Sequence, residues 1–240
     1  MPVAVITGAE RGIGKEAARQ LLERGFAVVI GSFDNSLAVE AQAELSAIGD
    51  VRWVHMDVTD DDSINSAFSR IEEDVPVVDV LVNNAGIVDL GSALDITRQQ
   101  LHEIFNVNAF GAAMVTRAAI PRLQGSAHPR IVNVSSGGGS LGRSALFAKT
   151  GATAAPILAY AASKAALNMI TVQTSLALGS APDLRHIKVN SVGPGTTATH
   201  VSGFQGQDVA DGARIIVQLA TADDESPTGG FFDIDCAVEW

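Results

Sequence analysis

The sequence predicts an α/β protein built on a doubly wound parallel sheet of about seven strands, with helices on both faces. Short runs rich in Val and Ile alternate with amphipathic stretches along the whole chain. These runs are continuously apolar, which is typical of strands covered on both faces. No linker-like segment, charge block or fixed repeat divides the 240 residues, so we expect a single domain over residues 1–240.

The alternation of the two patterns sets the order of the expected elements. Parallel strands joined in sequence require helical crossovers, and these cover both faces of the sheet. The expected strands are Val3–Thr7, Ala27–Gly31, Val51–His55, Val77–Val82, Arg130–Val134, Ile187–Val192 and Gly230–Ile234. The expected helices are Gly12–Arg24, Ser36–Ile48, Asp61–Glu73, Thr97–Leu123, Ala159–Gly179 and Asp208–Ala220.

Composition excludes several classes of protein. Hydrophobic residues make up 47% and charged residues 18% of the chain, which excludes wholesale disorder. The net charge of −11 argues against nucleic acid or an anionic membrane surface as a general partner. A single cysteine, Cys236, excludes a disulfide framework. The N-terminus lacks a charged n-region, and no apolar run reaches about 18 residues, so we expect a cytoplasmic protein with neither a signal peptide nor a membrane span.

A glycine-rich turn follows the first predicted strand. Gly8, Gly12 and Gly14 lie between that strand and the next helix. Backbone N–H groups at such a helix start suit a pyrophosphate, and side chains would block its approach. An ordinary βα turn is the alternative, but the strand before and the helix after favour a dinucleotide site. The five histidines have no ligand spacing, so no metal site is expected. No P-loop motif occurs, and the absence of a G-x-S-x-G elbow argues against a serine hydrolase of the α/β type.

The spacing G-x-x-x-G-x-G in this turn resembles that of the short-chain dehydrogenase/reductase family, and further matches follow in family order along nearly the whole chain. They are Asp57-Val58 after the third strand, Asn83-Asn84-Ala85-Gly86 at the end of the fourth, Asn108 within Asn106–Gly111, Ser136 after the fifth, the pair Tyr160 and Lys164, and Pro194-Gly195 after the sixth. The resemblance implies a Rossmann fold that carries both the cofactor and the catalytic groups.

The resemblance also implies the site residues. The implied catalytic residues are Asn108, Ser136, Tyr160 and Lys164. The implied cofactor contacts are Gly8, Arg11, Gly12, Ile13, Gly14, Ser32, Asp57, Val58, Asn84, Ala85, Gly86, Tyr160, Lys164, Pro194 and Gly195. Lys164 is expected to hold the nicotinamide ribose, and Asn108 to anchor a water in a proton relay. The choice of Ser136 over Ser135 rests on the family pattern alone.

The pair Tyr160 and Lys164 suits proton transfer. Residues four apart share one face of a helix. A free tyrosine has a pKa of about 10, and a neighbouring ammonium is expected to lower it. Ser136 can donate a hydrogen bond to the same carbonyl oxygen, while a nicotinamide supplies hydride. As single residues, a lone tyrosine is most often a packing residue and a lone serine can simply end a strand. The set predicts the reduction of a ketone or aldehyde, or the reverse oxidation of an alcohol.

Two other functions stay open. A non-catalytic dinucleotide sensor of the same fold would be favoured by loss of the Tyr, Lys or Ser, and none of these is lost. An epimerase or dehydratase would use the same Tyr and Lys on nucleotide sugars. Relatives of that kind usually carry a substantial C-terminal substrate domain, and this chain ends soon after its seventh predicted strand.

The end of the second strand predicts a preference for NADP(H), with NAD(H) as the open alternative. Ser32 takes the position where NAD-preferring relatives carry an acid, and it cannot repel a 2′-phosphate. Arg11 lies where basic residues contact that phosphate in NADP-preferring relatives. Against this, Phe33 takes a position often held by arginine, and Asp34 lies near the spacing of a ribose-binding acid.

The chain departs from the simpler family members between Ser136 and Tyr160, where 23 residues make the gap about twice the usual length. We expect the segment Gly137–Ala159 to be an enlarged wall or lid over a small-molecule carbonyl or alcohol substrate. A longer insertion at this place is similar to that of the monomeric carbonyl reductases. Its apolar face would be formed by Leu146, Phe147, Ile157 and Leu158. A plain surface loop is the alternative. The segment after Pro194-Gly195 is short by comparison.

Two helices predict self-association. Ala159–Gly179 carries one charged residue, Lys164, and Ile104–Thr116 carries none. Helices on the surface of a monomer usually show a charged stripe. Small uncharged faces suit packing against another subunit, so we expect a homo-oligomer. A monomer would result if the Gly137–Ala159 segment folds over these faces.

Overall fold

The computed structural model describes residues 1–150, 156–234 and 236–240, and the strands in this part of the chain form one seven-stranded sheet. The strand order is β3-β2-β1-β4-β5-β6-β7, and every neighbouring pair is parallel. The strands are β1 (Val3–Thr7), β2 (Ala27–Ser32), β3 (Val51–His55), β4 (Val80–Asn83), β5 (Arg130–Val134), β6 (Lys188–Val192) and β7 (Phe231–Phe232). The predicted fold class is confirmed.

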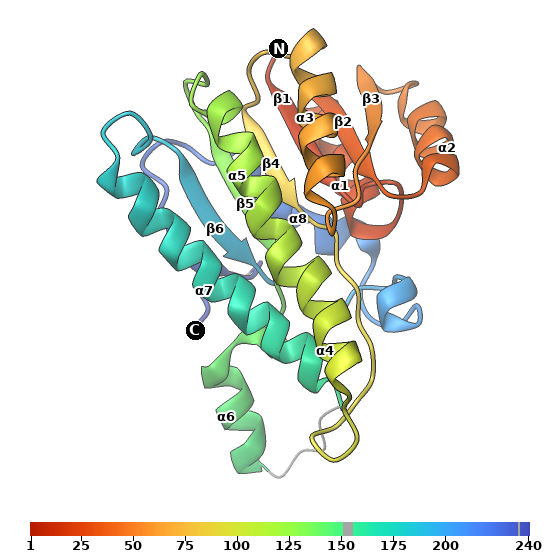
Figure 1. The fold of residues 1–240 in the computed structure, drawn as a ribbon, viewed down its shortest axis with the longest axis vertical. Helices are drawn as coiled ribbons and strands as arrows, with labels where there is room; N and C mark the ends of the chain where they lie inside the picture. The colour runs from red at the N-terminus through yellow and green to blue at the C-terminus, as the bar shows by residue number, and fades with distance from the viewer. Residues whose placement is uncertain (151–155, 235) are drawn as a thin grey trace.

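Helices cover both faces of this sheet (Figure 1). One apolar cluster joins the strands to α1 (Gly12–Glu23), α2 (Asn35–Leu45) and α8 (Val209–Ala220). A second cluster on the other face joins them to α3 (Asp61–Asp74), α5 (Ala112–Leu123) and α7 (Leu158–Ser180). Because both faces are covered, every residue of β2 and β5 is buried, which explains their continuous apolar sequence.

The strand order reverses between β1 and β4. The chain runs outward from β1 to the edge strand β3 and then returns to pair β4 with the other side of β1. Ile6 of β1 lies opposite Val82 of β4, so both strands end at the same level. In open α/β sheets the crevice at this reversal is where ligands bind. The residues after β1 and after β4 therefore meet at the expected place.

The predicted helix over Thr97–Leu123 contains a π-helical turn. It consists of α4 (Arg98–Phe105), the π-helical turn Asn106–Gly111 and then α5. Gly111 packs against Val58, where an added Cβ would lie 2.7 Å from the Val58 carbonyl oxygen. A π turn inserts an extra residue and re-aims the side chains beside it. Helical periodicity predicted the helix but not this local insertion.

The segment between Ser136 and Tyr160 contains a helix that the sequence did not predict. After a 3₁₀ turn at Gly137–Gly139, α6 spans Leu141–Thr150 and projects beyond the sheet (Figure 1). The chain returns at Pro156, whose carbonyl accepts from the N–H of Gly91 at 2.6 Å. Residues 151–155 and the side chain of Phe147 lie outside the described part of the chain. The glycine run before α6 hid its start, because glycine is typical of loops.

The C-terminal segment folds back on β7. The N–H of Val238 donates to the carbonyl of Phe231 at 2.7 Å, and the N–H of Asp233 donates to the carbonyl of Cys236 at 3.0 Å. These contacts bring the last residues beside the start of α6. Across the described ranges, no helix combines the length and the apolar character that crossing a membrane requires.

Candidate active site

Glycine permits close packing in the turn after β1. Gly8 and Gly12 have φ angles of +63° and +57°, a region that side chains rarely adopt. A Cβ on Gly14 would lie 2.4 Å from Nδ2 of Asn84, and one on Gly8 would lie 3.0 Å from Cα of Ala85. A side chain at Gly8 or Gly14 would force the turn away from the end of β4.

Thr7 and Asn84 lock this turn to β4. The hydroxyl of Thr7 accepts from the N–H groups of Asn84 and Ala85, both at 3.0 Å. In return, Nδ2 of Asn84 donates to the carbonyls of Thr7 and Gly8 at 2.9 Å. The predicted residues Asn84 and Ala85 thus contact the glycine turn directly. Thr7 was not among the predicted site residues, although its place at the end of a strand, directly before Gly8, could have suggested it.

The start of α1 fits an anionic group. Arg11 takes the N-cap position without a side-chain cap, and the first turn carries no acid. The N–H groups at the start of α1 therefore combine with the positive end of the helix dipole beside a cradle that a Cβ would fill. Ile13 packs its side chain into the core below. These residues fit the pyrophosphate of a dinucleotide.

The segment after β6 lies over the same turn. Gly195 has a φ of +78°, and the carbonyl of Pro194 accepts from the side chain of Gln207. Thr199 lies above Gly12, with its Cγ2 3.5 Å from the place where a Cβ would be. The sequence did not predict Thr199 as a site residue, because no local spacing links it to the glycine turn.

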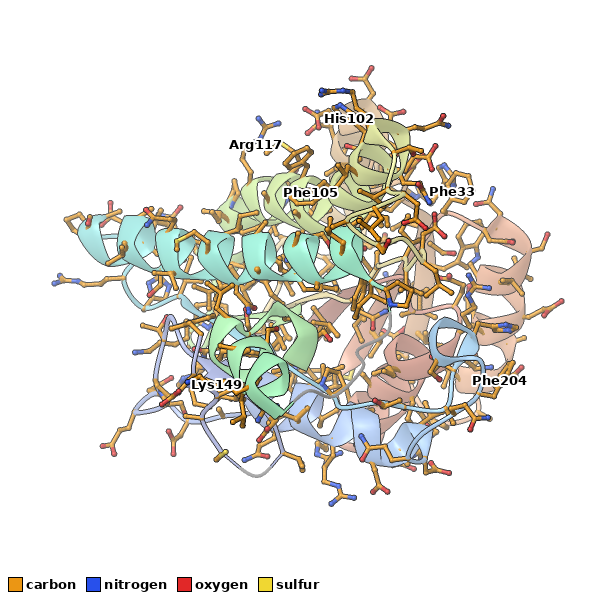
Figure 2. All side chains as sticks on the ribbon, turned by 90° about the horizontal axis from the view of Figure 1, so that it is seen from below. Phe33, His102, Phe105, Arg117, Lys149 and Phe204 are labelled. Carbon is orange, nitrogen blue, oxygen red and sulfur yellow. The ribbon has the colours of Figure 1, made fainter. Side chains whose placement is uncertain are left out.

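The polar side chains at the end of β2 form hydrogen bonds within the same segment of the chain. The buried hydroxyl of Ser32 donates to the carbonyl of Asp34 at 2.9 Å. The carboxylate of Asp34 caps α2 by accepting from the N–H groups of Ser36 and Leu37. Phe33 is 70% exposed and extends from the surface (Figure 2). The acid that could have marked an NAD-type ribose contact is therefore engaged as a helix cap.

The remaining predicted cofactor contacts in this region are Arg11, which follows β1, and Asp57 and Val58, which follow β3. Arg11 is largely exposed, with Nε 3.9 Å from a carboxylate oxygen of Glu10. Oδ1 of Asp57 accepts from the N–H and the hydroxyl of Thr59, which stabilises the turn after β3. Val58 packs under Gly111, at the π turn. The chain thus brings Asp57 and Val58 beside the helix that carries Asn108.

Lys164 is buried at the centre of the site. It is 3% exposed, and its Nζ donates to the carbonyl of Val134 at 2.7 Å. Burial lowers the pKa of Lys164 to about 8. A Cβ on Gly86 would lie 3.4 Å from Nζ of Lys164 and 3.3 Å from Oδ1 of Asn108. Glycine at this position lets the β4 end approach both side chains.

Asn108 ties the β4 end to α7. Its Oδ1 accepts from the N–H of Ile87 at 2.8 Å, and its Nδ2 donates to the carbonyl of Ile87 at 2.9 Å. Nδ2 also donates to the hydroxyl of Ser163 at 3.0 Å, and that hydroxyl donates to the carbonyl of Tyr160 at 2.7 Å. The π turn around Asn108 therefore connects to the first turns of α7.

Tyr160 lies beside both Lys164 and Ser136. Nζ of Lys164 is 5.8 Å from the centroid of the Tyr160 ring. Burial raises the pKa of Tyr160, and a hydrogen bond with Ser136 is the smaller, opposing effect. The expected fall in the pKa of Tyr160 is therefore not found: the pKa is raised, because removal of the phenol from water dominates. Tyr160 consequently keeps its proton at neutral pH.

The two adjacent serines have different surroundings. Ser135 is buried, and its hydroxyl donates to the carbonyl of Lys164 at 3.4 Å. Ser136 is partly exposed, accepts from the N–H of Gly138 at 3.2 Å and reaches Tyr160. Ser136 is therefore the one that can reach a ligand beside the tyrosine, which the sequence alone could not decide.

The chain is similar to known proteins over most of its length. A family model described as short chain dehydrogenase matches residues 2–210. The chain belongs to the short-chain dehydrogenase/reductase family. Within this family, the chain is similar to the short-chain dehydrogenase anuI of Penicillium roqueforti, with 33% identity over 229 residues that cover 92% of this chain and 88% of the relative.

Two further proteins are similar to the chain at slightly lower sequence identity. A 3-alpha-(or 20-beta)-hydroxysteroid dehydrogenase of Mycobacterium tuberculosis is 29% identical over 244 residues, which cover 97% of this chain and 87% of the relative. The solved structure of salutaridine reductase from Papaver somniferum superposes with a TM-score of 0.83 at 26% identity, covering 98% of this chain and 100% of that one. The protein is therefore an oxidoreductase of this family with a dinucleotide-binding fold.

Proposed function

We propose that this enzyme reduces a ketone or aldehyde to an alcohol with NADPH, or catalyses the reverse reaction, as a single cytoplasmic domain. The convergence of Tyr160, Ser136 and Lys164 beside the glycine turn carries the proposal. The phenol is protonated at neutral pH and hydrogen-bonded to a serine, so one oxygen can receive a proton and a hydrogen bond together.

The chain's own residues divide the work. The turn from Gly8 to Gly14 and the start of α1 would hold the pyrophosphate, and Lys164 the nicotinamide ribose. When bound, NADPH supplies the hydride to the carbonyl carbon. Ser136 orients the carbonyl oxygen by a hydrogen bond, and Tyr160 donates its phenolic proton to that oxygen. The ammonium of Lys164, close to the ring, stabilises the phenolate that remains.

The test is NADPH oxidation, followed by absorbance, against a panel of ketones, quinones and aldehydes. Cyclic ketones belong in the panel because one relative is named for hydroxysteroids. Turnover of at least one carbonyl compound supports the proposal. Tight NADPH binding without turnover of any compound, or of the matching alcohols with NADP⁺, would contradict it and favour the dinucleotide sensor.

We expect NADPH to be preferred over NADH. Ser32 cannot repel a 2′-phosphate, Asp34 is engaged in capping α2, and the exposed guanidinium of Arg11 can reach a phosphate beside the turn. Comparison of kcat/KM for the two cofactors measures the preference. Arg11→Ala should weaken NADPH more than NADH. Arg24→Ala, at the other end of α1, is the matched control and should change neither. Equal or better kcat/KM with NADH would contradict the expectation.

The segment Gly137–Ala159 is expected to act as a lid that contacts substrate. Cδ1 of Ile157 and Oγ of Ser136 both lie 3.6 Å from the point where a Cβ on Gly138 would be. Leu146 and Leu158 expose apolar surface on the same segment. Ile157→Ala should therefore change KM across the substrate panel by severalfold and leave the KM for NADPH unaltered.

Ile120→Ala on α5 provides the matched control for this prediction. That side chain is also partly buried, but it packs against the apolar cluster that joins the sheet to α3, α5 and α7. It should lower stability without changing the substrate profile. An unchanged profile in Ile157→Ala would favour the surface-loop interpretation.

We expect a homo-oligomer that buries the outer faces of α4, α5 and α7. Phe110, on the π-helical turn between α4 and α5, and Met169 and Leu176, on α7, are each more than half exposed. Phe105, the last residue of α4, has its ring centroid 6.1 Å from that of Phe110. The described part of the Gly137–Ala159 segment leaves Met169 and Leu176 uncovered. This favours association over an internal cover.

Light scattering coupled to size exclusion tests this expectation. The mass at micromolar concentration should be at least twice the 24.9 kDa of one chain. Leu176→Arg should shift it toward that of a single chain, whereas Val39→Arg, at an exposed position on α2, should not. A mass near 24.9 kDa for the unmodified protein would contradict the expectation.

A further inference from the structure

A buried hydroxyl lies four residues after Ser136. Ser140 has no exposed surface. Its Oγ donates to the carbonyl of Glu239 at 2.7 Å and accepts from the N–H of Arg143 at 3.0 Å. Beside it, the N–H of Gly142 donates to the carbonyl of Trp240 at 3.0 Å. The start of α6 is thus bonded to two consecutive residues at the C-terminal end.

The turn between Ser136 and Ser140 is stiff. The N–H of Gly139 donates to the carbonyl of Ser136 at 2.9 Å, and the N–H of Ser140 donates to that of Gly137 at 3.2 Å. A Cβ on Gly139 would lie 2.7 Å from the carbonyl carbon of Lys164. These two hydrogen bonds and the contact with the backbone of α7 at Lys164 join Ser136 and Ser140 in one closely packed turn.

The C-terminal residues that hold Ser140 are themselves anchored. The Trp240 ring stacks on Phe231, with centroids 5.8 Å apart and an angle of 23° between the planes. Phe231 is buried, and its ring lies 3.3 Å from the point where a Cβ on Gly193 would be. An ion pair between Arg143 and Asp233 adds a second link from α6 to the segment after β7. The C-terminal segment therefore connects β7 to the turn that carries Ser136.

We propose that Ser140, held by the backbone of Glu239 and Trp240, is a positioning residue that sets the distance of Ser136 from Tyr160. The inference rests on the proposed function, because it assigns Ser136 and Tyr160 to one carbonyl oxygen. The glycine turn is held separately, by Thr7 and Asn84. Loss of the Ser140 hydroxyl should therefore affect the carbonyl half of the site and spare cofactor binding.

Ser126 offers a matched control. It is also buried, its Oγ donates to Asp79 at 2.6 Å, and it accepts from the N–H of His128 at 3.2 Å. It lies just before β5, at the other end of the sheet. Ser126→Ala removes the same kind of group without touching the site, so both variants should lose similar stability.

The first experiment compares kinetics. Ser140→Ala should lower kcat for carbonyl reduction about tenfold or more, because small misplacements of a catalytic group are expensive in rate. The KM for NADPH should stay within twofold. Ser126→Ala should keep the kcat of the unmodified enzyme. Trp240→Ala should repeat the Ser140→Ala pattern, and Trp240→Phe, which keeps a ring to stack on Phe231, should restore most of the rate.

The second experiment needs no turnover. Tyr160 is the only tyrosine in the chain, so its ionisation can be followed by ultraviolet absorbance. The hydrogen bond with Ser136 lowers the pKa of Tyr160. Ser136→Ala and Ser140→Ala should both raise that pKa, while Ser126→Ala should not. Lys164 lies beside the ring in all three variants, and its pKa of about 8 means that it loses its charge before the tyrosine titrates.

The outcomes separate the two proposals. If the unmodified enzyme reduces no carbonyl compound, the proposed function fails, and the titration alone decides whether Ser140 positions Ser136. If Ser136→Ala raises the tyrosine pKa and Ser140→Ala leaves both pKa and kcat unchanged, the inference is overturned. If Ser140→Ala fails to fold, the kinetic comparison and the tyrosine titration are made on Trp240→Ala instead.

Discussion

Tyr160→Phe is expected to lower kcat for carbonyl reduction by about 10²–10⁴-fold, the range that general acid catalysis contributes. The substitution removes the phenolic proton donor and keeps the ring, so its packing beside Lys164 survives. Steady-state kinetics on the best carbonyl substrate measure the loss. Binding of NADPH, measured by fluorescence titration, should stay close to that of the unmodified enzyme because the glycine turn is untouched.

Ser136→Ala is the companion variant for this experiment. It removes a hydrogen bond to the carbonyl oxygen but leaves the proton donor in place, so it should lower kcat by less than Tyr160→Phe does. Near-normal carbonyl reduction in Tyr160→Phe would show that the catalytic assignment is wrong.

Lys164→Met is expected to abolish turnover and, at pH 7, to make the cofactor-free protein more stable. Burial lowers the pKa of Lys164 from 10.5 to about 8. Below pH 8 the lysine is charged in both the folded and unfolded states, and the full cost of burying the charge is present. Between about pH 8 and pH 10.5 the unfolded state binds more protons, so the stability of the unmodified protein rises with pH.

The size of this effect follows from the shift. At about 1.4 kcal/mol for each unit of pKa, the buried charge costs roughly 3 kcal/mol at pH 7. The lost hydrogen bond to Val134 reduces the gain in Lys164→Met. Urea unfolding from pH 6 to pH 10 should show the advantage of Lys164→Met shrinking as pH rises.

Lys164→Arg is the control for this second prediction, because a guanidinium stays charged throughout that range. The free energy of unfolding of Lys164→Arg, relative to that of Lys164→Met, should therefore not increase between pH 7 and pH 10. A constant stability difference between the unmodified protein and Lys164→Met across the whole pH range would contradict a lowered pKa.

Local sequence pattern was enough to predict the strands of the sheet and the glycine turn. Apolar runs of strand length alternate with helical periodicity, and both signals lie within about 20 consecutive residues, so β1, β3 and β5 were predicted at their observed bounds. The family spacing likewise identified Ser136, Tyr160 and Lys164 before any geometry was known. α6 was missed, because the glycine run before it is typical of a loop.

What the sequence by itself determined was the order of the strands and helices along the chain, the glycine turn and the set of side chains predicted to react, because these depend on neighbours along the chain or on the family spacing. Only the tertiary structure decided that Asp34 caps α2, that burial outweighs the Ser136 hydrogen bond in setting the pKa of Tyr160, and that Ser136 rather than Ser135 reaches the tyrosine. It alone joined Ser140 to Glu239, 99 residues later. Burial and long-range hydrogen bonds depend on which distant segments meet, and no local spacing records that.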